Sequence, residues 1–130
     1  MALYASTVFL GAFLLFLVQP IVARAILPWF GGSPAVWTAC MLFFQLVLLG
    51  GYAYAAATLA RLGPRRAPAV HLALLALALA FLPIVPDPGW KPEGAGLPIL
   101  RILGLLAATV GLPYFLLSAS APLLQAWAWA

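Results

Sequence analysis

Carboxylates are nearly absent from this chain. Asp87 and Glu93 are the only acidic residues, and both lie in a short segment rich in proline and glycine. Acid–base catalysis within a helix bundle, and proton-coupled transport across it, both depend on ionisable groups inside the helices. The lack of carboxylates in the apolar parts of the chain therefore argues against an enzyme and against a proton-coupled transporter.

Cysteine and basic residues are also scarce. Cys40 is the single cysteine, so the chain can form no internal disulfide. No histidine–cysteine cluster has the spacing of a metal site, and no glycine-rich phosphate loop follows a strand. The six basic residues are too dispersed to bind a nucleic-acid backbone. We therefore predict no catalytic residues, no metal, no cofactor and no nucleic-acid partner.

Long apolar runs make up most of the sequence. Four runs carry no charged side chain: 1–23, 25–60, 67–86 and 102–130. Each reaches or exceeds the roughly 18–20 residues needed to cross about 30 Å of hydrocarbon. With 67% hydrophobic residues, a soluble chain of this length would have too little polar surface to cover its outside. The sequence predicts an all-α integral membrane protein, with the lipid bilayer as its first partner.

Proline and glycine divide these runs into four predicted transmembrane helices, which form one bundle over residues 1–130. The predicted spans are about 4–27, 34–59, 68–82 and 97–124. The first run lacks a basic leading segment and is too long for a cleaved signal peptide, so we expect it to remain as a helix. Pro20 should kink the first helix, and Pro113 and Pro122 should interrupt the last.

Basic residues give a weak prediction of orientation. The three arginines of segment 61–66 favour a cytoplasmic position for that turn, which would place both termini in the cytoplasm. Arg24, Lys91 and Arg101 count for the opposite orientation. We predict cytoplasmic termini because Arg24 and Arg101 sit at helix ends, and because Lys91 lies in a longer loop.

Polar side chains within apolar helices are the candidate functional residues. An amide or a charge facing lipid is costly, so each should contact another helix, a headgroup, a substrate or water. The candidates are Gln19, Arg24, Ser33, Gln45, Arg101, Ser118 and Gln125. Hydrogen bonding between helices is the simpler interpretation of the glutamines, and a substrate-lining role is the alternative. Arg24 and Arg101 either anchor helix ends or bind an anionic headgroup or substrate. Ser33 precedes Pro34 at a favourable helix start, where its hydroxyl can cap a free N–H.

His71 is the only histidine and lies one turn into the third predicted helix. Ala67 lies four residues earlier, a spacing that in membrane helices leaves room for a pigment or haem over a ligating histidine. Alanine is so abundant in this chain that the spacing says little. A hydrogen-bonded or interfacial histidine is therefore the simpler interpretation, with cofactor ligation as the alternative.

Small residues cluster in the second predicted helix. Glycine and alanine four residues apart allow two membrane helices to approach closely. The predicted packing residues are Gly50, Gly51, Ala53, Ala55 and Ala57. This surface should contact another helix, either within the chain or from a partner.

Eight different short motifs are spread along almost the whole chain: LVQP (17–20), LP (27–28), GGSPAVW (31–37), CMLFFQ (40–45), GYAY (51–54), HL (71–72), GLPYF (111–115) and LSASAPLLQ (117–125). Together they resemble the membrane region of bacterial fused spermidine-synthase-like proteins, which is described as major-facilitator-like. The resemblance implies a multi-pass bundle in the bacterial inner membrane. The family's aminopropyltransferase-like domain has no counterpart in these residues, so no synthase activity carries over.

These observations predict a non-catalytic membrane subunit that packs against a larger membrane complex or a partner enzyme. Half of a carrier for a polyamine or an organic anion is the first alternative, because the helices broken at Pro20 and Pro113 resemble those that line transport cavities. A pigment- or haem-associated subunit is the second alternative, and it depends on His71 alone.

Overall fold

The computed structural model describes residues 1–82, 87–90 and 98–130, and these residues are helical nearly throughout. The α-helices are α1 (Ala2–Ile26), α2 (Pro34–Ala78), α3 (Pro98–Leu106) and α4 (Leu112–Ala128). Short 3-10 turns occupy Leu27–Trp29, Leu79–Phe81 and Pro88–Trp90, and a π-helical turn at Ala107–Gly111 joins α3 to α4. These described segments contain no β-strand, which confirms the all-α prediction.

Three helical stretches are long and apolar enough to cross a membrane: Ala2–Trp29, Pro34–Ala78 and Ile99–Ala128. Only 22, 33 and 44% of their most apolar windows is buried within the chain. The rest of this apolar surface needs lipid or other protein around it, because exposing so large an apolar surface to water is unfavourable. The fold is therefore compatible with a multi-pass membrane protein.

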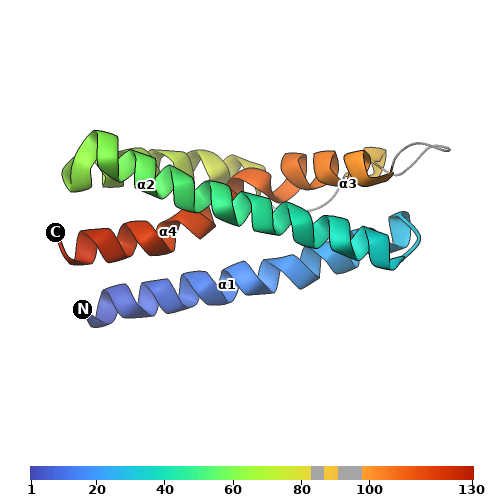
Figure 1. Ribbon diagram of the computed structural model, residues 1–130, viewed down its shortest axis with the longest axis horizontal. Helices are drawn as coiled ribbons and strands as arrows, with labels where there is room; N and C mark the ends of the chain where they lie inside the picture. Colours follow the sequence, from blue (N-terminus) through green and yellow to red (C-terminus); the bar gives the residue numbers. More distant parts are fainter. Residues whose placement is uncertain (83–86, 91–97) are drawn as a thin grey trace.

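Helix α2 folds back on itself at Gly63, whose φ of 70° and ψ of 171° are not helical. Figure 1 shows the first arm of α2 (34–62, cyan to green) reaching this bend and the second arm (64–78, yellow) returning beside it. The rings of Tyr54 and His71, on opposite arms, lie 6.0 Å apart between centroids. The two arms correspond to the predicted helices 34–59 and 68–82.

The turn between these two arms is shorter than the sequence predicted. We expected a polar turn over residues 61–66, but helical structure continues on both sides of Gly63. Pro64 directly follows the bend, where a missing N–H and a fixed φ favour the start of a helix. The second arm therefore begins four residues earlier than expected, and its regular part ends at Ala78.

Gly63→Ala is expected to destabilise the fold by about 1–3 kcal/mol, because a side chain at this φ strains the backbone. A Cβ at Gly63 would meet no heavy atom within 4 Å, so strain alone should cause the loss. Gly11→Ala is the control, since Gly11 lies within α1 and its nearest new contact would be 3.9 Å away. Thermal unfolding in detergent measures both variants, and equal melting temperatures would contradict this account of the bend.

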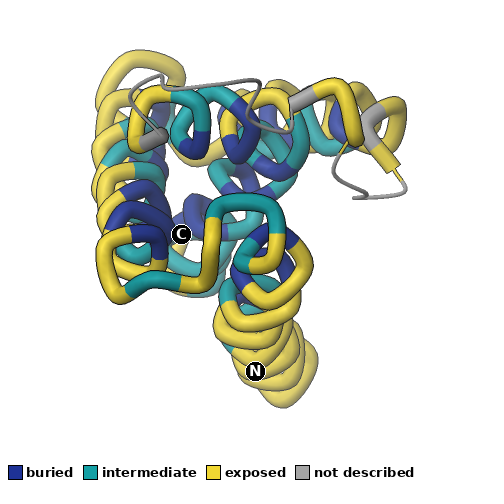
Figure 2. Tube along the Cα trace, turned by 90° about the vertical axis from the view of Figure 1, so that its right-hand side faces the viewer, coloured by how far each residue is buried: buried dark blue, intermediate teal, exposed yellow. Residues whose placement is uncertain are grey.

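Helix α4 lies at the centre of the bundle and packs against α1 and α2. In Figure 2 the buried residues lie along the inward faces, while the N-terminal half of α1 is almost wholly exposed. The largest fully buried side chains are Ile26, Cys40, Phe44, Ile102, Leu105, Leu106, Val110, Tyr114, Leu116 and Leu123. The main core is therefore apolar and lies between α1, the first arm of α2 and α3, and a smaller cluster lies where α2 packs on α4.

The last predicted helix, 97–124, differs from the observed one at its breaks. The irregular segment is the π-helical turn at Ala107–Gly111, just before Pro113, and Pro122 stays within α4. A wider turn suits this place because Pro113 cannot donate a backbone hydrogen bond to the preceding turn. Helix α1 likewise continues through Pro20. The loop predicted to hold both acidic residues and Lys91 lies partly outside the described residues, as does the expected helix start at 97.

Both chain termini lie at the same end of the bundle as the Gly63 bend (Figure 1). The link between α1 and α2 lies at the opposite end. Gly31 and Gly32 in this link have φ of 89° and 61°, values that glycine adopts without strain. The link at Gly31-Gly32 thus lies in the gap between the predicted spans 4–27 and 34–59.

Candidate functional site

A polar cluster of Tyr54, His71 and Ser120 joins both arms of α2 to α4, and its central residue, His71, is buried at 2% exposure. The Nε2 atom of His71 lies 3.0 Å from Oγ of Ser120 on α4. Its Nδ1 atom lies 3.5 Å from the hydroxyl oxygen of Tyr54 on the first arm. The Ser120 hydroxyl donates in turn to the carbonyl oxygen of Leu116, at 2.8 Å. Three segments far apart in the sequence thus share one set of polar contacts.

The contacts of Ser120 indicate that the Nε2 atom of His71 carries a proton. Because the Ser120 hydroxyl proton is donated to Leu116, its oxygen accepts a hydrogen bond from Nε2–H of His71. The Nδ1 atom lies beside the Tyr54 hydroxyl, at 3.5 Å. Both ring nitrogens of His71 are engaged. Ligation of a pigment or haem would therefore require the loss of one of these contacts.

A cavity of about 360 Å³ lies beside this cluster, between α1, the second arm of α2 and α4. Its polar members are Thr7, His71, Ser120 and Trp127. Its other lining residues are apolar or glycine: Val8, Leu10, Gly11, Leu14, Leu72, Leu75, Leu117, Ala121 and Leu124. Cavities of a few hundred cubic ångströms with mainly apolar walls are typical of small-molecule sites. The arrangement suits an uncharged, largely apolar molecule.

Trp127 borders both the cavity and His71. The ring centroids of these two residues lie 6.2 Å apart in an edge-on arrangement. Within the described ranges, the Trp127 indole nitrogen is the one buried side-chain nitrogen or oxygen that lacks a hydrogen-bond partner. No group of three or more metal-ligating side chains occurs in the same ranges. The chemistry available at this site is thus hydrogen bonding and apolar contact.

A second polar contact ties α1 to α4. The amide nitrogen of Gln19 donates to the hydroxyl oxygen of Tyr114, at 2.6 Å. Tyr114 is 1% exposed and packs on Phe44, with ring centroids 4.9 Å apart. The structure therefore gives Gln19 a partner on another helix.

We expect Gln19 and Tyr114 to be energetically coupled. In a double-mutant cycle of Gln19→Leu and Tyr114→Phe, the coupling energy should be about 0.6–1.7 kcal/mol, the range of hydrogen bonds between membrane helices. Gln125→Leu is the control, because Gln125 is exposed near the end of α4. Unfolding in mixed detergent measures all the variants. A coupling near zero would contradict a stabilising hydrogen bond.

The other candidate residues are not gathered at one site. Gln45 is exposed on the first arm of α2 and has no hydrogen-bond partner within the described residues. Arg24 is exposed in the last turn of α1, where a cation favours the negative end of the helix dipole. Gln125 is exposed near the C-terminal end of α4. A guanidinium nitrogen of Arg101 donates to the Gly89 carbonyl oxygen, at 3.4 Å.

Two serines behave differently from each other. Ser33 precedes α2 as predicted, but its side chain makes no capping hydrogen bond, and its backbone carbonyl accepts from Val36 and Trp37 instead. The predicted hydroxyl cap is therefore wrong. Ser118 is buried on α4, donates to the Phe115 carbonyl oxygen at 2.7 Å, and faces Gly51.

The predicted small-residue surface divides between two faces of α2. Gly51 and Ala55 are buried against α4, and Gly50 is half-buried beside Phe115. The other two predicted packing residues, Ala53 and Ala57, are exposed. The inward face accounts for the close approach of α2 and α4, and the outward alanines have no contact role within the described residues.

Two members of the His71 cluster, Tyr54 and Ser120, and the neighbouring Trp127 were not among the predicted site residues. A signal for Tyr54 does exist in the sequence. Tyr54 and His71 lie nine residues before and eight residues after Gly63, and a hairpin centred there places them side by side. Nothing in the sequence sets the register of α4 against this hairpin, so Ser120 and Trp127 could not be found in the same way.

No protein-family model, curated protein or solved structure matches this chain. The resemblance to the spermidine-synthase-like membrane family therefore stays a prediction.

Proposed function

We propose that this chain is a non-catalytic integral membrane subunit, and that the outer face of α2 packs against a helix of another membrane chain. The exposure of the Gln45 side chain supports this proposal most strongly. This side chain lies on α2, where the surrounding apolar surface requires lipid or protein. A partner helix would give this amide the hydrogen bonds that lipid cannot.

The depth of Gln45 makes its exposure costly. It lies eleven residues after Pro34, or about 16 Å along the helix at about 1.5 Å per residue. In a hydrocarbon layer about 30 Å thick this is close to the centre. An amide without a partner in such a medium costs roughly 2–7 kcal/mol. A lipid-facing position for Gln45 is therefore strongly disfavoured.

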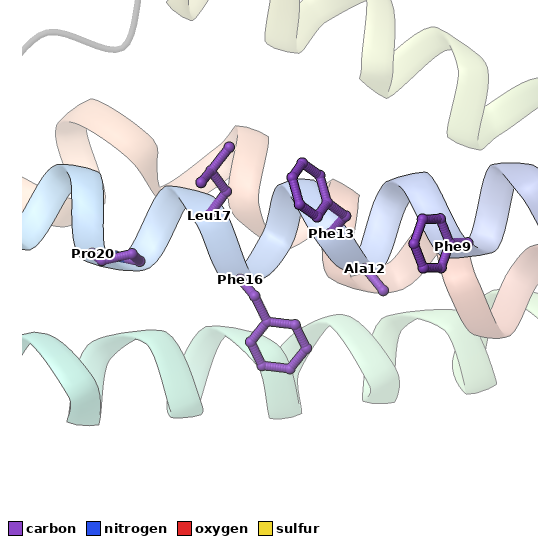
Figure 3. Close-up of a pocket in the computed structure, with 6 residues that line it drawn as sticks. All are labelled: Phe9, Ala12, Phe13, Phe16, Leu17 and Pro20. Atoms are coloured by element: carbon purple, nitrogen blue, oxygen red, sulfur yellow. The ribbon is translucent and has the colours of Figure 1, made fainter.

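Helix α1 provides the contrast of a face suited to lipid. Figure 3 shows six residues on α1 around a shallow surface pocket, and all of them are apolar. Phe9, Phe13 and Phe16 are 73, 54 and 67% exposed. This face offers aromatic and aliphatic surface with no hydrogen-bonding side chain, as contact with acyl chains requires. The outer face of α2 differs from it in composition.

We further propose that four segments cross the bilayer: α1, each arm of α2, and α3 together with α4. The shortest, residues 64–81, would extend about 27 Å at about 1.5 Å per residue, which is close to the hydrocarbon thickness. The arginines beside the Gly63 bend favour a cytoplasmic position for this end and for both termini. The resemblance to the spermidine-synthase-like membrane family favours the bacterial inner membrane.

Gentle detergent extraction from native membranes, followed by size determination and mass spectrometry, tests this proposal. We expect the chain to migrate in a defined assembly larger than its own 13.7 kDa plus bound detergent. Recovery only as a lone, stable chain would count against a subunit role.

A carrier for a small molecule is a second candidate, supported by the cavity beside His71. Its lining offers no carboxylate to a polyamine and no lysine or arginine to an organic anion. An uncharged, largely apolar solute fits this lining better than either of the substrates expected from the sequence. Uptake by proteoliposomes, compared with a Leu75→Trp variant that fills the cavity, tests this alternative. Equal uptake by both would reject the cavity as the route.

A further inference from the structure

Seven exposed residues follow one another along the outer face of the first arm of α2 with alternating spacings of three and four. They are Ala35, Thr38, Leu42, Gln45, Leu49, Tyr52 and Ala56, and we name them the α2 seam. This spacing is the heptad pattern by which two helices pack along each other over several turns. The seven side chains therefore lie in one stripe along the arm, which is the geometry that a partner helix needs.

The composition of the α2 seam also points to a protein partner. Polar residues recur every seven positions, at Thr38, Gln45 and Tyr52, with apolar residues between them. The Thr38 hydroxyl already donates to the Pro34 carbonyl oxygen, at 2.9 Å. Gln45 and Tyr52 have no hydrogen bond within the described residues. The amide of Gln45 is thus the main unsatisfied group of the seam.

We propose that the α2 seam pairs with the same seam of a second copy of this chain, about a two-fold axis normal to the membrane. This inference rests on the proposed function and names its partner helix. Copies inserted with the same orientation are related by such an axis, which sets each position opposite itself. An amide both donates and accepts, so two Gln45 side chains satisfy each other. No second kind of chain is needed to complete the seam.

The apolar positions of the seam fit the same pairing. Leu42 and Leu49 flank Gln45 on either side and would pack against their counterparts. Ala35 and Ala56, at the two ends, are small enough to let the helices approach closely. A strict repeat of 3.5 residues favours a left-handed crossing of about 20°. The whole length of the seam can then remain in contact.

Disulfide crosslinking in native membranes tests this pairing. The background is Cys40→Ala, which removes the single, buried cysteine. Leu42→Cys and Leu49→Cys introduce thiols on the seam, and Leu46→Cys introduces one just beside it. The three leucines are 49, 66 and 55% exposed, so exposure alone does not separate them. Mild oxidation should give a band of twice the 13.7 kDa chain mass for the two seam positions and little for Leu46→Cys.

Gln45→Leu in the Leu49→Cys background tests the role of the amide. Loss of the reciprocal hydrogen bonds should weaken dimerisation roughly threefold to twentyfold. Equal crosslinking at positions 42, 46 and 49 would overturn the seam, and an unchanged yield with Gln45→Leu would overturn the role of the amide. Crosslinks only to a different protein would overturn the pairing with a second copy of this chain, but they would agree with the proposed function. Crosslinks to no protein at any position would contradict both.

Discussion

Gly51→Ala should destabilise the bundle by about 1–3 kcal/mol, the cost of forcing extra volume into a packed contact. Gly51 is buried where α2 approaches α4. A Cβ there would collide with the Ser118 hydroxyl oxygen and lie 3.0 Å from the Phe115 backbone carbonyl oxygen. The carbonyl belongs to α4 itself and cannot rotate away, so the two helices must separate. Thermal unfolding in detergent measures the loss.

Gly50→Ala is the matched control. A Cβ at Gly50 would meet only the Phe115 ring, at 3.4 Å, and that contact needs little or no movement. A small effect is expected there. Adding Ser118→Ala to Gly51→Ala removes the hydroxyl but not the carbonyl, so rescue should be partial. Similar melting temperatures for Gly50→Ala and Gly51→Ala would contradict the close contact between α2 and α4.

His71→Ala should cost about 2–4 kcal/mol, because it empties a buried volume and removes the hydrogen-bond partner of two other side chains. His71→Phe keeps most of the volume and loses only the polar contacts, so its effect should be intermediate. Ser120→Ala should cost about 1 kcal/mol, the usual value for one hydrogen bond. Unfolding in mixed detergent measures this series.

The order of the three variants is the informative result. Because the His71 cluster stabilises the fold in this account, His71→Ala should lower the stability most and Ser120→Ala should lower it least. Because His71 is the only histidine of the chain, no second imidazole can substitute for it. Equal stability of wild type and His71→Ala would show that the cluster does not stabilise the bundle.

The helical fold could be predicted from the sequence because its causes are local. Charge-free runs that are long enough, as helices, to cross the hydrocarbon layer predict membrane helices, and Gly31-Gly32 predicts a break. The Gly63 bend also has a local cause, although its position was placed only within a polar turn. The π-helical turn before Pro113 was harder to predict, since proline is equally compatible with a kink and with a wider turn.

The placement of polar side chains could not be predicted, because it depends on which helix face turns inward. Gln19 and Gln45 occur in similar apolar surroundings, yet Gln19 bonds to Tyr114 and Gln45 faces outward. Apolar residues occupy all faces of these helices, so periodicity does not separate core from exterior. In the observed register of α4 against α2, Gly51 lies against Phe115 and Ser118. That register brings Ser120 to His71.

The central claim is that the outer face of α2 contacts protein while the outer face of α1 contacts lipid. Nitroxide labels at Leu49→Cys and Phe16→Cys, in a Cys40→Ala background, test it through their collision rates with oxygen dissolved in native membranes. The two side chains are 66 and 67% exposed in the isolated chain, so exposure within the chain does not separate them. The account predicts a collision rate several times lower at position 49 than at position 16. Equal rates at the two positions would contradict it.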